Sequence, residues 1–219
     1  MRFFLADLGR AWRERSTLLC LALALVGVLA PLAGLPARMT GADRWLAAHD
    51  RLLPFVYPLL SAGGYSLMFL RERESGMGKN IRLALGARRY RFARLAVVWT
   101  TGAGVLTLPV LALCLLCRHF PRELWLAPLC GAAFAGLSHG LGCLNRRGYI
   151  PLLAPWVLCL LLTYAAPYLD APALWPPLWW STAIQPGWGS LSLSVGVCAG
   201  LMALSAALTA LGREEDAPC

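Results

Sequence analysis

Six long stretches of the chain contain no Asp, Glu, Lys or Arg. They cover residues 17–37, 52–70, 95–117, 124–144, 149–169 and 190–212. Each is 19 to 23 residues long, which as a helix spans roughly 30 Å, the thickness of the hydrocarbon core of a bilayer. The pattern therefore predicts an all-α polytopic membrane protein with six transmembrane helices.

A different pattern precedes the first apolar stretch. Phe4, Leu8 and Trp12 recur at every fourth residue, while Asp7 and Arg10 fall between them. This spacing predicts an amphipathic helix over residues 1–16 that lies in the cytoplasmic headgroup layer, with its arginines facing anionic lipid. We therefore divide the chain into this interface helix and a six-span membrane domain, residues 17–219.

Composition and charge support a membrane protein and give it an orientation. The chain is 58% hydrophobic and 14% charged, and its net charge is +9. Fifteen basic residues fall in segments 1–16, 71–94, 145–148 and 213–219, against five in the alternate segments. The positive-inside rule then predicts a multi-pass protein of the bacterial inner membrane with both termini and the loop 71–94 in the cytoplasm. Since topology accounts for the basic excess, we expect no nucleic-acid partner.

Two short motifs resemble catalytic or nucleotide-binding signatures. Residues 136–140 match the G-x-S-x-G nucleophile elbow, but that elbow requires a strand–turn–helix, and here it falls inside an apolar helix. Residues 76–80 resemble a phosphate-binding loop, yet Arg73 and Asn80 stand where the pattern requires Gly and Ser or Thr. We therefore expect no catalytic residues and no cofactor in this chain.

Cysteines and small residues along the spans favour packing roles. Cys114 and Cys117 have a spacing seen in redox and metal sites, and His119 follows them, but no second pair accompanies them. The glycine pairs at 136/140 and 196/200 have the GxxxG spacing that permits close helix approach. These pairs indicate packing either within one subunit or between two.

The predicted spans contain hydroxyl groups where many carriers have charges. Span 52–70 contains Tyr57, Ser61 and Tyr65, and span 149–169 contains Thr163 and Tyr164. A route lined by these side chains would be mildly polar, so it suits amphipathic or hydrophobic cargo better than a bare ion. The alternative is that these hydroxyls bond to neighbouring backbone.

The basic loop 71–94 contains a second amphipathic pattern. Met77, Ile81 and Leu85 recur at every fourth residue between Ser75, which can cap a helix, and Gly86, which can end it. A short helix here could bind lipid headgroups or place its apolar side on a cytoplasmic partner.

This loop also resembles the one after span two in type-2 ABC exporter permeases. The residues that match the family pattern are Glu74, Ser75, Gly76, Arg88 and Arg94. Gly86 stands where a proline is common, and Arg94 stands where lysine is usual. The N-terminal amphipathic helix, six spans, internal termini and long final outer loop, residues 170–189, are also similar to that family.

The resemblance implies a function and a set of partners. In the family the loop forms a coupling helix that inserts into a separate cytoplasmic P-loop ATPase, which binds ATP and Mg²⁺, and two permease subunits pair as a homodimer or heterodimer. Here Met77, Ile81, Leu85 and Arg88 would contact the ATPase, and Glu74 would order the loop. Short permeases like this one resemble the branch that exports, and gives immunity to, peptide antibiotics.

We therefore expect the permease subunit of an ATP-driven exporter of peptide, lipid or drug-like cargo, with no bond chemistry of its own. Two alternatives stay open. One is an intramembrane hydrolase, which would need paired catalytic groups at one depth. The other is a membrane scaffold that recruits partners through its basic loop.

Overall fold

Helices account for nearly all of the described chain. The computed structural model describes residues 2–36, 38–74, 86–145, 149–169 and 191–212, and no strand occurs within these ranges. In chain order the α-helices are α1 (Arg2–Arg13), α2 (Arg15–Ala33), α3 (Gly41–Glu74), α5 (Ala87–Cys117), α6 (Leu126–Leu144), α7 (Tyr149–Ala165) and α9 (Leu191–Leu211). Two 3-10 turns, η1 (Arg122–Trp125) and η2 (Ala166–Leu169), precede α6 and follow α7. The all-helical class predicted from sequence is confirmed for the described residues.

Four described helices are long and apolar enough to cross a membrane. They are Arg15–Ala33, Arg88–Cys117, Leu126–Leu144 and Leu191–Leu211. The expected span 149–169 corresponds to α7, a shorter helix of 17 residues, and to η2. The expected span 52–70 lies inside α3, which has 34 residues and carries charged side chains near both ends. Four of the six stretches predicted from sequence thus correspond to described helices that are long and apolar enough to cross a membrane.

Helix ends depart from the charge-free stretches because capping, rather than charge, sets them. α3 begins 11 residues before the apolar stretch that starts at residue 52. Thr40 Oγ1 accepts a hydrogen bond from the backbone N–H of Asp43 at 3.2 Å, the first half of a capping box. α5 begins after Gly86, whose φ of 80° suits glycine and would strain any other residue. Most of the segment expected to be an outer loop, residues 38–51, is therefore helix.

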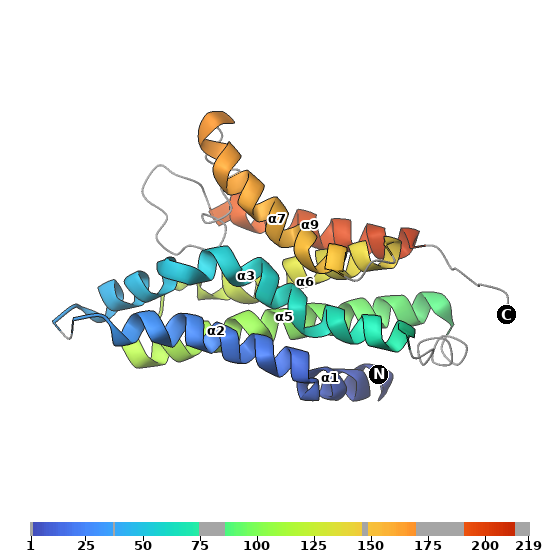
Figure 1. The fold of residues 1–219 in the computed structure, drawn as a ribbon, viewed down its shortest axis with the longest axis horizontal. Coiled ribbons are helices and arrows are strands. Elements are labelled where there is room, and N and C mark those ends of the chain that lie inside the picture. Colours follow the sequence, from blue (N-terminus) through green and yellow to red (C-terminus); the bar gives the residue numbers. More distant parts are fainter. Residues whose placement is uncertain (1, 37, 75–85, 146–148, 170–190, 213–219) are drawn as a thin grey trace.

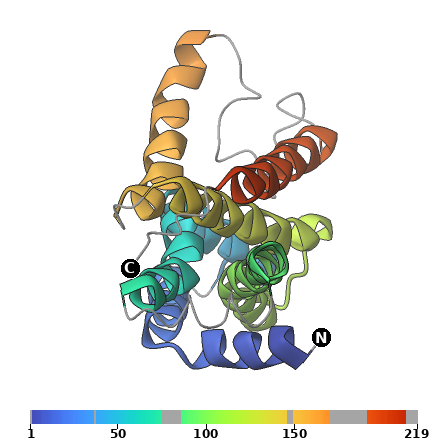
Figure 2. The same ribbon diagram turned by 90° about the vertical axis from the view of Figure 1, so that its right-hand side faces the viewer.

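The long helices run roughly along one axis and bring several connections to the same end (Figure 1). α1, the end of α3, the start of α5 and the end of α9 all lie there, and we call this the basic end. Figure 2, viewed from that side, shows α1 crossing beneath α2 and α5. α7 leans away from the other helices. The N-terminal helix and the end of α9 therefore share one end of the bundle.

Glycines bring α5, α6 and α9 into close contact. A Cβ atom on Gly131 of α6 would clash with the backbone oxygen of Gly102 of α5. One on Gly140 would lie 3.0 Å from the backbone oxygen of Ser205 in α9. Around Gly196 and Gly200 of α9, by contrast, a Cβ would meet nothing within 4 Å. The first GxxxG pair therefore packs within the subunit, whereas the second lies on an open face.

Candidate functional site

Four charged side chains from three helices meet at the basic end. Asp7 and Arg10 come from α1, Glu72 from the last turn of α3, and Arg94 from the second turn of α5. Arg94 is 0% exposed, Asp7 4% and Glu72 6%. We call these four residues the ion cluster.

Arg94 is the centre of the ion cluster. Its Nη1 donates to both carboxylate oxygens of Asp7, each at 2.7 Å, and its Nη2 forms an ion pair with Glu72. Nη2 also donates to the hydroxyl of Tyr90, one turn earlier in α5, at 3.1 Å. Arg10 donates to Asp7 at 2.8 Å and pairs with Glu72 as well. One guanidinium thus connects α1, α3 and α5.

Charge balance makes this burial tolerable. Two carboxylates and two guanidinium groups sum to zero, and each buried charge contacts at least one opposite charge. Removing a charge from water is compensated only by close opposite charges and by further hydrogen bonds. A guanidinium offers five donors in a planar fork and can bond two carboxylates at once, which a lysine ammonium does less well. This geometry explains an arginine at position 94.

Packing around the ion cluster places Asp7 on the buried side of α1, whereas the sequence pattern had placed it on the polar side. Ala11 is buried with Val97 and Val98 of α5, and Phe4 and Leu8 pack against this group. Asp7 and Arg10 form ion pairs with each other and with side chains of α3 and α5. The reason is register: residues 4, 7, 8 and 11 follow the i, i+3, i+4, i+7 spacing of one helix face, so Asp7 is part of the packed side.

The residues expected to couple to an ATPase lie beside the ion cluster or outside the described residues. Glu74 is the last residue of α3, two positions after Glu72. Arg88 is exposed in the first turn of α5, six positions before Arg94. Met77, Ile81 and Leu85 lie outside the described residues. Glu72 and Arg94 therefore fix the chain on both sides of segment 75–85.

The expected cargo residues are placed only in part. Tyr57 and Tyr65 belong to α3, but their side chains lie outside what the structure describes. Ser61 is buried and donates to the Pro58 carbonyl at 3.3 Å, and Thr163 donates to the Cys159 carbonyl at 2.7 Å. Both bonds stay within one helix, as in the alternative considered from sequence. Tyr164 is 73% exposed on the outside of α7, and the cargo route stays a prediction.

The remaining sequence motifs lie in packed helices or outside the described residues. Ser138 is buried inside the continuous helix α6, so no strand–turn–helix surrounds it. Cys114 Sγ accepts a hydrogen bond from the indole N–H of Trp45 at 3.2 Å. Over the described parts of the chain, no three His, Cys, Asp or Glu side chains lie close enough to hold a metal ion. The Trp-rich segment 170–189 and the phosphate-loop look-alike 76–80 fall outside the described residues.

Sequence reasoning missed Asp7 and Glu72 as site residues. Both are acids within strongly basic segments, and Asp7 lies on the apolar face of its helix. An acid in such a place needs a buried basic partner, and this was the available signal. Comparison with family models, curated proteins and solved structures gives no match, so the site's own geometry has to carry the functional argument.

Proposed function

We propose that this chain is the membrane subunit of an ATP-driven exporter of the ABC type. One observation carries the proposal: the ion cluster joins α1, the end of α3 and the start of α5 at both edges of segment 75–85. In this proposal the chain spans the bacterial inner membrane six times with both termini in the cytoplasm. A cytoplasmic P-loop ATPase binds ATP and Mg²⁺ and acts on segment 75–85.

The ion cluster would connect segment 75–85 mechanically to the helix bundle. A loop held at one end would absorb displacement by bending, whereas a loop fixed at both ends passes it to the helices. Glu72 and Arg94 hold these ends together, and Asp7 attaches α1 to the same group. Displacement of segment 75–85 would therefore move α1, α3 and α5 together, which is a suitable link between ATPase closure and helix rearrangement.

Apolar and basic residues would both contact the ATPase, but they would contribute different amounts of binding free energy. Burying Ile81 or Leu85 in a partner groove would contribute about 1.5–3 kcal/mol each. Arg88 is exposed, so an ion pair there would contribute only about 0–1 kcal/mol. In this proposal the apolar stripe Met77, Ile81 and Leu85 provides affinity, and Arg88 helps orient the partner.

Cargo and assembly follow from the resemblance and from the composition of the spans. Two such subunits, identical or different, would enclose a route for amphipathic or hydrophobic cargo such as a peptide, lipid or drug-like molecule. Tyr57, Ser61, Tyr65, Thr163 and Tyr164 are the side chains we propose along that route. Within the family, the chain resembles the branch that exports peptide antibiotics and gives immunity to them.

Co-purification tests the coupling assignment. The tagged chain is extracted in mild detergent from its native membrane, and ATP hydrolysis is measured on the washed resin. We expect Ile81→Asp and Leu85→Asp to release the ATPase, because a carboxylate cannot enter an apolar groove without a large desolvation cost. Arg82→Ala, the matched control in the same segment, should retain it.

Three outcomes would distinguish the coupling proposal from a lipid-bound loop, a scaffold and a hydrolase. Full retention of ATPase by both aspartate variants would end the coupling assignment and favour a lipid-bound loop. Retention of the ATPase without ATP-dependent movement of labelled peptide or lipid in proteoliposomes would instead indicate a scaffold. Cleavage of lipid or peptide by the purified chain without ATP would indicate a hydrolase.

A further inference from the structure

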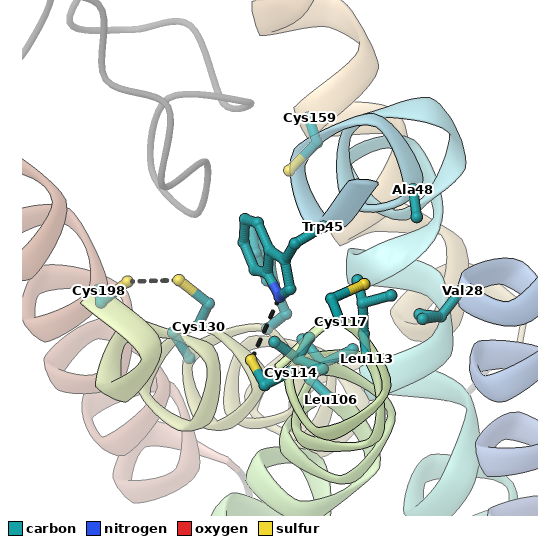
Figure 3. Close-up of a cluster of buried hydrophobic side chains, with 13 residues drawn as sticks. Val28, Trp45, Ala48, Leu106, Leu113, Cys114, Cys117, Cys130, Cys159 and Cys198 are labelled. Carbon is teal, nitrogen blue, oxygen red and sulfur yellow. Dashed lines mark hydrogen bonds between the residues drawn. The ribbon is translucent and has the colours of Figure 1, made fainter. Parts of the chain in front are cut away.

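Several cysteines gather in the core away from the basic end. The buried cluster there contains Cys114, Cys117, Cys130, Cys159 and Cys198, contributed by α5, α6, α7 and α9 (Figure 3). Figure 3 shows Cys130 and Cys198 pointing toward one another from α6 and α9. Their Sγ atoms are 3.4 Å apart, and the residues are 0% and 2% exposed.

We propose that Cys130 and Cys198 form a dithiol that hydroperoxides oxidise to a disulfide, fixing α6 to α9. Two thiols already in contact on different helices need only a further approach of roughly 1.4 Å to reach the bond length of about 2.05 Å. Rotation about the two Cα–Cβ bonds, together with a slight approach of α6 and α9, would supply this movement.

The reaction balances with one hydroperoxide per dithiol. The sulfur of Cys198 attacks the terminal oxygen of the hydroperoxide, the O–O bond breaks, and an alcohol leaves with the thiol proton. The sulfur of Cys130 then attacks the resulting sulfenic acid, the S–S bond forms, and water leaves with the second proton. Two thiols are oxidised and one hydroperoxide is reduced. A thiol or dithiol reductant reverses the step by exchange.

Access to Cys198 requires local opening of α9, because the residue is 2% exposed and its neighbours Val197 and Leu201 pack against the same buried cluster. α9 buries few of its residues, and Gly196, Ala199 and Gly200 beside Cys198 are exposed on its outer face. In a membrane that face meets lipid, where lipid hydroperoxides form and where small hydroperoxides dissolve. A hydroperoxide dissolved there would reach the sulfur when α9 locally separates from α6.

The disulfide would complete the attachment of α9 to α6. Nearer the basic end these helices already meet closely, where Gly140 lies against Ser205 and Leu208. The new bond would add a covalent link farther along the same interface, so the two helices could no longer separate or slide. This inference rests on the thiol geometry alone and is independent of the proposed transport function.

A split-chain experiment tests it directly. A protease site is inserted within residues 170–190, and Cys219 is changed to Ser so that Cys198 is the only cysteine after the cut. Membranes containing the full chain are treated with cumene hydroperoxide or hydrogen peroxide, free thiols are blocked, and the chain is cleaved. Under non-reducing conditions we expect the two fragments to migrate as one linked species that dithiothreitol separates.

Matched variants identify the pair. Cys130→Ser and Cys198→Ser should each abolish the link, whereas Cys159→Ser, in the same core, should retain it. Mass spectrometry of the uncut, otherwise unaltered chain should find the peptide pair joined through Cys130 and Cys198. Fragments that separate after oxidation of the parent chain, or a link that survives Cys130→Ser, would overturn the proposal.

Discussion

The ion cluster predicts strong energetic coupling between α1 and α5, which a double-mutant cycle measures. The cycle uses Asp7→Asn, Arg94→Gln and the double variant. Arg94→Gln removes the buried guanidinium that contacts both carboxylates, while Arg10, whose side chain is 37% exposed, still pairs with them. Breaking a buried pair by removing one partner typically costs about 3–5 kcal/mol. We expect a loss of unfolding free energy in that range.

Asp7→Asn should cost less because Arg94 keeps its ion pair with Glu72. What is lost is the charge assistance of the bonds to Asp7, worth about 1.5–3 kcal/mol. In the double variant the two losses overlap, since each removes the same bonds. The coupling energy should therefore be about 1–3 kcal/mol, within the usual range for residues in contact.

The assay is reversible unfolding in mixed micelles with increasing dodecyl sulfate, followed by loss of helical circular dichroism. Arg89→Gln is the matched control, because Arg89 is exposed on the same helix and should change stability by less than about 0.5 kcal/mol. Arg94→Lys keeps the charge but loses part of the fork, so its stability should lie between wild type and Arg94→Gln. Additive losses from Asp7→Asn and Arg94→Gln, within about 0.5 kcal/mol, would refute the cluster as a coupled unit.

Three further predictions concern packing, orientation and nucleotide. Gly131→Val should destabilise the bundle by about 1–3 kcal/mol in the same assay, because its side chain meets the backbone of Gly102, whereas Gly196→Ala should not destabilise it. With all other cysteines replaced, Cys219 should react with a membrane-impermeant maleimide only after the cell membrane is opened; labelling of intact cells would reverse the orientation. The purified chain should not hydrolyse ATP, and hydrolysis that is lost in Lys79→Ala would contradict a separate ATPase subunit.

Apolar patterning predicted which parts of this chain are membrane-like helices but not where those helices end. A stretch without charges marks a segment that tolerates hydrocarbon, whereas a helix continues until its backbone meets a cap or a turn. Thr40 and Asp43 begin α3 well outside its apolar stretch, and α5 starts at Ala87. The sequence contains these capping residues, but a criterion based only on the absence of charges does not take them into account.

The sequence singled out Arg94 but did not show that it is buried. Because Arg94 directly precedes an apolar stretch, it was counted among the cytoplasmic charges and matched to the permease loop pattern. In the fold it is fully buried and bonded to two acids that are far away in sequence. Sequence alone could not pair residues 7, 72 and 94, because their meeting depends on how α1, α3 and α5 pack.

In the proposed transporter, the position of the ion cluster at one end of the bundle would suit a coupling role better than a position at the bilayer centre. Charges at the centre of a bilayer are expensive to hold and costly to move, so a network there would resist rearrangement. At the basic end, Asp7, Glu72 and Arg94 are buried by protein, while Arg10 stays partly exposed. The cluster joins three helices, and in the proposed function it would lie near enough to the protein surface to move with a partner. A stable joint next to segment 75–85 requires both properties.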